Sequence, residues 1–169
     1  DSATNDGIIN ENEYIGCTTG TGNGFGDVIG NTGQLCVDSS AAGALNFGLI
    51  KGEGHINDAV VIYIDSVEGG AASTENFTDD TDGLRRAISG KDGANVSVLT
   101  FAPGFTADYA IAFAVGTDEN EQGFAGLWEL NENDEHTFIR SVNLTPAFPR
   151  NNANFEIDLL LSDIGLIPG

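Results

Sequence analysis

The feature that most constrains the fold of this chain is a repeated alternation of side chains with a period of two residues. In the run Tyr109-Ala110-Ile111-Ala112-Phe113-Ala114-Val115, large residues alternate with alanine. Successive side chains of a β-strand point to opposite faces, so this run predicts a strand with one bulky face and one face that a neighbouring layer can approach closely. No stretch of useful length shows the helical period of 3.6 residues. The chain is therefore predicted to be all-β.

Similar runs recur along the chain between turn residues such as Asp82-Gly83 and Lys91-Asp92-Gly93, which favour tight turns. We expect strands at residues 45–49, 60–64, 96–101, 109–115, 124–130, 137–142 and 155–161, with shorter ones near Tyr14 and Leu35. About nine short strands predict an antiparallel sandwich or barrel. A length of 169 residues suits a single domain over residues 1–169. Short helical turns are expected at 84–88 and at 162–164, where Ser162 is suited to be the cap.

Cys17 and Cys36 are the only cysteines, and they flank one loop rich in glycine, threonine and asparagine. A disulfide between them is the prediction, and it stabilises the fold by roughly 3 kcal/mol if it acts on chain entropy. Two buried thiols or a metal-binding pair are the alternatives, although the CxxC spacing typical of metal pairs is absent. Because disulfides persist in oxidising compartments, the pairing predicts a secreted, extracellular or cell-surface protein.

The charge of the chain is strongly negative, since 26 acidic residues face six basic ones and the formal net charge is −20. Such a surface repels phosphates, which argues against binding to nucleic acid or to an anionic membrane. No apolar run approaches the length of a membrane span, so no membrane insertion is expected. The acidity points to cations, to high salt or simply to a solvated acidic coat.

Calcium is the cation that the acidic loops suit best, because it prefers several oxygen ligands on short loops. The strongest candidate ligands are Asp79, Asp80 and Asp82. A second set, Asp6, Asn10 and Glu13, has the spacing of the later half of an EF-hand loop but lacks its early ligands. Acidic loops that bind no ion are the alternative interpretation.

The sequence offers no recognisable catalytic group. His55 and His136 are the only histidines, and no GxSxG motif is present. The glycine-rich stretch 20–27 matches neither a dinucleotide-binding nor a Walker motif. Acidic pairs suited to glycoside hydrolysis can be chosen at will among 26 carboxylates, so none is singled out. The chain is predicted not to be an enzyme and to fold without a cofactor other than calcium.

Several segments resemble secreted jelly-roll domains related to family 9 carbohydrate-binding and DOMON-like modules. The likeness begins at Asp6-Gly7-Ile8-Ile9-Asn10-Glu11-Asn12-Glu13-Tyr14 and continues through residues 59–65, 83–90, 99–105, 108–110 and 161–166. It covers most of residues 6–167 and is similar to a domain that recurs in secreted bacterial surface proteins. The resemblance implies a jelly-roll-like sandwich and an extracellular location, and it transfers no ligand-binding residue.

These features are compatible with two functions. The leading hypothesis is a non-catalytic structural subunit that assembles with copies of itself, or with the cell surface, into a filament, sheet or matrix. Residues 1–13 would then form an N-terminal extension or donated strand, with Ile8 and Ile9 as apolar anchors in an edge left open after Ile167. The alternative is a carbohydrate-binding module that stacks a polysaccharide on Trp128, Tyr63 or Tyr109.

Overall fold

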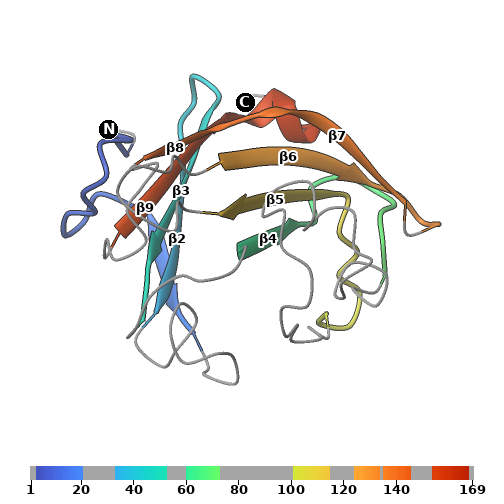
Figure 1. Ribbon diagram of the computed structural model, residues 1–169, viewed down its shortest axis with the longest axis horizontal. Helices are drawn as coiled ribbons and strands as arrows, with labels where there is room; N and C mark the ends of the chain where they lie inside the picture. The colour runs from blue at the N-terminus through green and yellow to red at the C-terminus, as the bar shows by residue number, and fades with distance from the viewer. Residues whose placement is uncertain are drawn as a thin grey trace. The chain divides into compact units, whose positions relative to one another are not determined.

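A computed structural model describes residues 3–20, 33–52, 60–72, 101–114, 124–133, 135–145 and 154–167 (Figure 1). The described part of the chain is all-β, with two antiparallel sheets and one short 3-10 helix. The nine strands are β1 (Gly16–Thr19), β2 (Gln34–Ser39), β3 (Ala44–Ile50), β4 (Val60–Ile64), β5 (Tyr109–Ala114), β6 (Phe124–Leu130), β7 (His136–Ser141), β8 (Asn143–Thr145) and β9 (Asn154–Leu160). The predicted all-β class with two antiparallel sheets, the arrangement from which a sandwich is built, is confirmed.

The two sheets belong to two compact units, and each unit is built from separate stretches of the chain. One unit contains the five-stranded sheet, whose order is β1-β2-β3-β9-β8. The other contains the four-stranded sheet, whose order is β4-β5-β6-β7. In the described part of the chain, the strands pass from the five-stranded sheet to the four-stranded sheet after β3 and return to the five-stranded sheet after β7.

The five-stranded sheet has one apolar and one polar face. In the register of β3 with β9, Leu45, Phe47 and Leu49 lie opposite Leu159, Ile157 and Phe155, and all six side chains are buried. The alternate positions form what we call the polar face, made of Cys36, Asp38, Asn46, Gly48, Glu156 and Asp158. In the middle of the sheet, the period of two thus separates an apolar face from one that carries Asp38, Asn46, Glu156 and Asp158, while Ala44, Ile50 and Leu160 occupy end positions of the same alternate set.

The four-stranded sheet is consecutive in the chain, and β5 is one of its two central strands. Ile111 and Phe113 are fully buried on one of its faces. On the other face, Ala110 and Ala112 leave room for Trp128, and these residues form a cluster with Ala71, Ala107 and Leu130. The alternation of large and small residues therefore serves the purpose that the sequence indicated.

The predicted strands correspond closely to observed ones, with a few differences. The run 155–161 ends at Leu160, because Leu161 begins the 3-10 helix. The short strand expected near Tyr14 is β1, which begins two residues later at Gly16. The run 137–142 ends one residue early, because the chain leaves the four-stranded sheet at Val142 and enters the five-stranded sheet as β8. Phe101 lies outside any strand, and the other residues of the run 96–101 lie outside the described part. The helical turn expected at 84–88 also lies outside it.

The helical turn expected at 162–164 is present as the 3-10 helix η2 (Leu161–Ile164). Its start is capped differently from the expectation, because the Asp163 side chain, and not that of Ser162, accepts a hydrogen bond from the Leu160 backbone N–H at 2.7 Å. Among the described residues, no helix has the length and apolar character needed to cross a membrane.

Candidate functional site

The most distinctive site in the described residues is formed by an N-terminal segment, residues 3–14, lying on the polar face of the five-stranded sheet. Polar groups of the segment bond to side chains on β2, β3 and β9, which follow it in sequence by 35 to 150 residues. Ala3 and Tyr14 are buried there together with Cys36, and Ile9 packs against them. The segment is therefore part of the folded unit.

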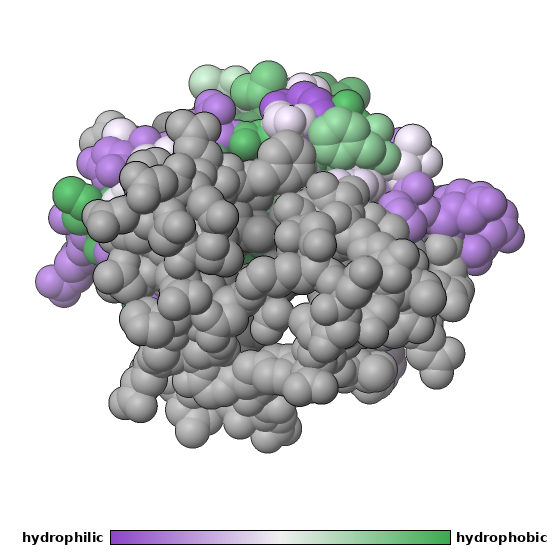
Figure 2. Space-filling model, in the orientation of Figure 1, coloured by the Kyte–Doolittle hydropathy of each residue, from purple (hydrophilic) through white to green (hydrophobic). Residues whose placement is uncertain are grey.

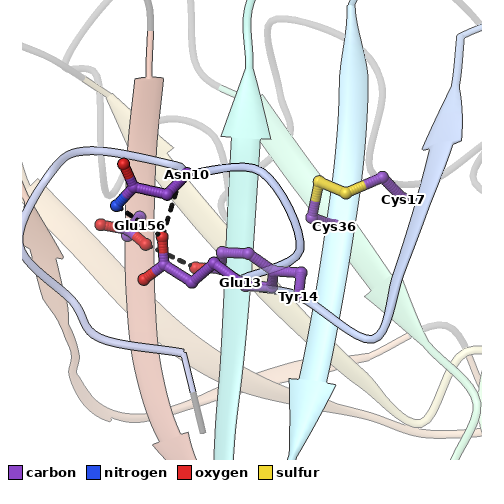
Figure 3. The surroundings of a disulfide bond; sticks show 6 residues. All are labelled: Asn10, Glu13, Tyr14, Cys17, Cys36 and Glu156. Carbon is purple, nitrogen blue, oxygen red and sulfur yellow. Dashed lines mark hydrogen bonds between the residues drawn. A yellow bond between two sulfur atoms is a disulfide. The ribbon is translucent and has the colours of Figure 1, made fainter. Parts of the chain in front are cut away.

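Glu156 is the centre of this site. Its carboxylate is completely buried and accepts three hydrogen bonds, all from the N-terminal segment. The backbone N–H groups of Asp6 and Gly7 donate to Oε2 at 3.0 and 2.6 Å, and the Tyr14 hydroxyl donates to Oε1 at 2.7 Å. Figure 3 shows Tyr14 reaching across β3 toward Glu156 on β9. Three donors provide the pairing that a buried carboxylate needs.

Tyr14 shows the electrostatic effect of this arrangement. Burial, the hydrogen bond to Glu156 and the nearby carboxylates of Glu156, Glu13 and Asp158 all raise the pKa of the Tyr14 hydroxyl above its ordinary value. A phenolate beside Glu156 would lose its donated hydrogen bond and face several negative charges. Tyr14 is consequently held as a neutral donor.

A second buried carboxylate holds the start of the segment. Asp38 on β2 accepts a hydrogen bond from the Ala3 backbone N–H at 2.9 Å, and the amide of Asn46 on β3 donates to the Ala3 carbonyl oxygen at 3.3 Å. Asp38 and Asn46 are paired across the strands, so both main-chain groups of Ala3 are bound by one cross-strand pair. The polar face thus recognises the backbone of the segment at two separate points.

Two glycines allow the segment to lie where it does. Gly7 has φ 84°, a left-handed conformation that side chains disfavour, and this conformation presents its N–H to Glu156. Gly48 has no side chain where Ile9 and Tyr14 cross β3. A Cβ at Gly48 would lie 2.9 Å from both Ile9 Cδ1 and Tyr14 Cζ, closer than side-chain packing permits. The absence of a side chain at Gly48 therefore leaves the space that Ile9 and Tyr14 occupy.

Of the predicted calcium ligands, Asp6 and Glu13 accept hydrogen bonds from the backbone of the segment, and the Asn10 side-chain amide donates to Glu13 at 3.3 Å. Glu13 accepts hydrogen bonds from the backbone N–H groups of Thr4 and Asn10 at 2.9 and 2.8 Å, and Asp6 Oδ1 accepts one from Ile8 N–H. Burial opposes ionisation of Glu13, but the bonds from Asn10 and Thr4 outweigh it and lower its pKa. In the described part of the chain, no three His, Cys, Asp or Glu side chains are grouped to hold a metal ion. Asp79, Asp80 and Asp82 lie outside that part.

The predicted disulfide between Cys17 and Cys36 is confirmed. The two residues face each other in the register of β1 with β2, and the sulfur atoms are bonded at 2.04 Å. Cys36 is buried beneath the N-terminal segment, whereas all four residues of β1 are exposed (Figure 3). The bond therefore ties an exposed edge strand covalently to the strand that carries Asp38.

The three rings proposed for sugar stacking all belong to the four-stranded sheet. Trp128 is buried, with Phe138 edge-on at a centroid distance of 5.2 Å, and its ring lies over Gly126. Tyr63 is half-buried and meets Phe101 edge-on at 5.3 Å. Tyr109 is also half-buried, and its burial together with Glu129 and Asp108 raises the pKa of its hydroxyl. Trp128 is thus a core residue, which excludes it as an open stacking platform.

Another buried carboxylate, Asp108, organises a turn in the four-stranded unit. It accepts hydrogen bonds from the backbone N–H groups of Ser66 and Val67 and from the Ser66 hydroxyl. Asp65 similarly accepts a bond from Thr106 N–H at 3.2 Å. These contacts join the turn after β4 to the segment that precedes β5, and they have a structural role.

The comparisons with known proteins add no relative. No protein-family model, curated protein or solved structure matches this chain. Its function must therefore be inferred from its own residues.

Glu156, Asp38 and Gly48 were not identified as site residues from the sequence. Glu156 stands in an alternating strand, Asn154-Phe155-Glu156-Ile157-Asp158-Leu159, where a polar residue is expected to face solvent. The only sequence signal was the presence of two carboxylates on one strand face, and such a pair is ordinary on an exposed sheet. Nothing local indicated that residues 3–14 would cover it.

Proposed function

We propose that this chain is a non-catalytic, extracellular structural protein whose copies assemble into a filament, sheet or matrix. The observation that carries the proposal is the exposure of neighbouring apolar side chains on the edge strand β7. Phe138 is 50% exposed and Ile139 is 42% exposed, and no other described strand pairs with the far side of β7. Figure 2 shows hydrophobic residues at the surface where Figure 1 draws β7.

The position of these side chains matters more than their number. Isolated apolar residues are common on protein surfaces, but adjacent ones on a sheet edge of a highly charged protein favour a contact surface. Aromatic residues are also enriched in protein interfaces. Trp128 packs edge-on against the Phe138 ring, so Phe138 offers a partner an aromatic surface held in position by this contact.

The geometry of β7 favours contact through side chains over strand addition. Its register with β6 shifts between Leu127 and Trp128, and Ile139 is the residue that the pairing skips. Such a bulge bends a strand and disrupts an edge as a template for another strand. Copies are therefore expected to meet through Phe138 and Ile139 rather than by continuing the sheet.

The extracellular location is supported by the Cys17–Cys36 disulfide, since such bonds persist in oxidising compartments and are rare in the cytosol. The charge of −20 sets a condition on assembly, because copies repel one another until salt or cations screen them. Calcium is one cation that would serve this role.

The proposal is tested by sedimentation velocity at increasing salt, comparing the unaltered protein with Ile139→Lys and Val67→Lys. Val67 is 37% exposed and lies in a turn of the same unit, so both variants add the same charge at similar exposure. We expect Ile139→Lys to raise the concentration needed for assembly at least tenfold and Val67→Lys to leave it nearly unchanged. Equal behaviour of the two variants would remove β7 from the assembly. A protein that stays monomeric but is retained by polysaccharide would favour the carbohydrate-binding function.

A further inference from the structure

We propose that the polar face of the five-stranded sheet is a receptor for the N-terminal segment of a second copy, so that residues 3–14 are exchanged between neighbours. This inference rests on the proposed self-assembly and names the segment and surface that join the copies. It differs from the expected filling of an open edge, because the segment lies over a sheet face and adds no strand to the sheet.

The receptor side is formed entirely by residues distant in sequence from the segment that they bind. Asp38, Asn46 and Glu156 come from three different strands, and each is at least nine-tenths buried. Among the residues that the structure describes, no basic side chain bonds to Asp38 or Glu156, and backbone N–H groups and the Tyr14 hydroxyl supply the pairing. These bonds would be chemically identical if another copy supplied the segment.

The segment side behaves as a ligand with two kinds of anchor. The main chain is bound at Ala3 and again at Asp6 and Gly7, which fixes the register of the segment. Ile9 and Tyr14 then fill the space above Gly48. Ile8, the other predicted anchor, is 57% exposed and points away from this contact. Backbone bonds provide affinity while the two side chains provide specificity, as in other complexes with extended peptides.

The disulfide determines where the segment can separate from its own unit. Cys17 is bonded to Cys36, so β1 stays with its own sheet and the pivot must lie between Tyr14 and Cys17. The two residues there are suited to this, because Ile15 is 79% exposed and Gly16 has nothing within 4 Å of its Cβ position. Residues 3–14 can span at most about 40 Å when extended. The segment can therefore reach a neighbour while β1 stays in place.

Exchange of this kind costs little, because each hydrogen bond and packing interaction that breaks within one chain forms again between two chains. The closed form is favoured when the protein is dilute, since its segment is present at high effective concentration. Association through β7 raises the local concentration of neighbouring copies, and this shifts the equilibrium from the closed form toward the exchanged form. A reciprocal exchange gives a closed pair, whereas a head-to-tail exchange that does not close gives a filament.

The test uses the full chain with one introduced cysteine per copy, Ala3→Cys in one preparation and Asn46→Cys in the other. The native cysteines are bonded to each other, so the introduced thiols are the only free ones. The Asn46 amide lies 3.3 Å from the Ala3 carbonyl oxygen, which places both positions within range of a short thiol-specific crosslinker. The two variants are mixed before assembly is induced, then crosslinked and analysed by denaturing electrophoresis and mass spectrometry.

A covalent pair joining residue 3 of one copy to residue 46 of another is the expected result, and it should be absent when either variant assembles alone. If the mixture assembles without this pair, while a chain carrying both substitutions crosslinks only within itself, exchange is overturned and the proposed function stands. If no variant and no unaltered protein assembles, both proposals fail. Should Asn46→Cys not fold, Asp38→Cys offers a second position beside Ala3, because Asp38 accepts the Ala3 N–H.

Discussion

At the scale of single residues, Gly48 determines whether the N-terminal segment can lie on the sheet. We expect Gly48→Ala to destabilise the protein by about 1–3 kcal/mol, because the added methyl group would meet Ile9 and Tyr14 at 2.9 Å. The Tyr14 ring cannot easily yield, since its hydroxyl is bonded to Glu156. Chemical denaturation measures the loss, and hydrogen exchange should show reduced protection at the amides of Asp6 and Gly7.

Gly16→Ala is the matched control for this substitution. Gly16 is also a strand glycine, but nothing lies within 4 Å of its Cβ position. We expect a change within about 0.5 kcal/mol for Gly16→Ala. Strand propensity alone would make either Gly→Ala change neutral or slightly stabilising. A similar loss in both variants would therefore mean that the close packing of Ile9 and Tyr14 is not the cause of the loss at Gly48.

Tyr14 makes a prediction about alkaline pH. Its folded pKa is raised above the unfolded value near 10, so its contribution to stability is fully present below pH 10 and is lost as the pH rises above that value. Tyr14→Phe should therefore be less stable than the unaltered protein at pH 8 but lose less stability between pH 8 and pH 11. Tyr63 and Tyr109 are present in both proteins, so their contributions cancel when the two losses of stability are compared. Equal losses over this range would show that Tyr14 does not titrate differently in the folded protein.

At the scale of strands and segments, the disulfide holds β1 to the rest of its sheet. Every residue of β1 is exposed and its only described neighbour is β2, so little besides backbone pairing and the Cys17–Cys36 bond keeps it in place. Reduction and alkylation should destabilise the protein by roughly 3 kcal/mol. For a chain of this length, that corresponds to a fall in thermal midpoint of about 6–12 °C.

Differential scanning calorimetry on the oxidised and the reduced, alkylated protein checks this. Intact mass measured before and after reduction verifies that both thiols were modified. An unchanged thermal midpoint after complete alkylation would mean that the disulfide does not stabilise the folded unit. The bond would then not be what keeps β1 on its own sheet when residues 3–14 separate from it.

The strands were predictable because their signal is local. In β5 and β9 the alternation of side chains in the sequence matches the observed faces of the sheets. The cover over Glu156 was not predictable, because the same alternation assigns Glu156 and Asp158 to a solvent-facing side. The burial of Glu156 depends on a segment about 150 residues earlier in the chain. The division of the run 137–142 at Val142 was missed for a similar reason, since a change of sheet leaves no mark on the period of two.

The same distinction applies to the chemistry of the site. Cys17 and Cys36 were paired correctly because they were the only two cysteines and flanked one loop. Asp6, Asn10 and Glu13 were predicted as calcium ligands; in the structure the carboxylates of Asp6 and Glu13 accept backbone hydrogen bonds, and the Asn10 side-chain amide donates to Glu13. Spacing alone cannot separate a carboxylate that binds a cation from one that accepts N–H groups, because both need the same negatively charged oxygen.

At the scale of the whole molecule, self-association must overcome a charge of −20 on every copy. Raising the ionic strength shortens the screening length from about 30 Å at 0.01 M to about 8 Å at 0.15 M, so the repulsion between copies weakens strongly over that range. Assembly should accordingly increase with sodium chloride. Calcium at matched ionic strength should act more strongly only if it also binds carboxylates directly.

The most direct test of the central claim is the mass of the unaltered particle in solution, measured by light scattering over a series of protein and salt concentrations. The proposed function predicts growth from the 17.6 kDa single chain to large particles as salt or calcium is added, with regular filaments or sheets in electron micrographs of the same samples. A mass that stays at that of one chain under every condition, with the fold intact, would contradict it.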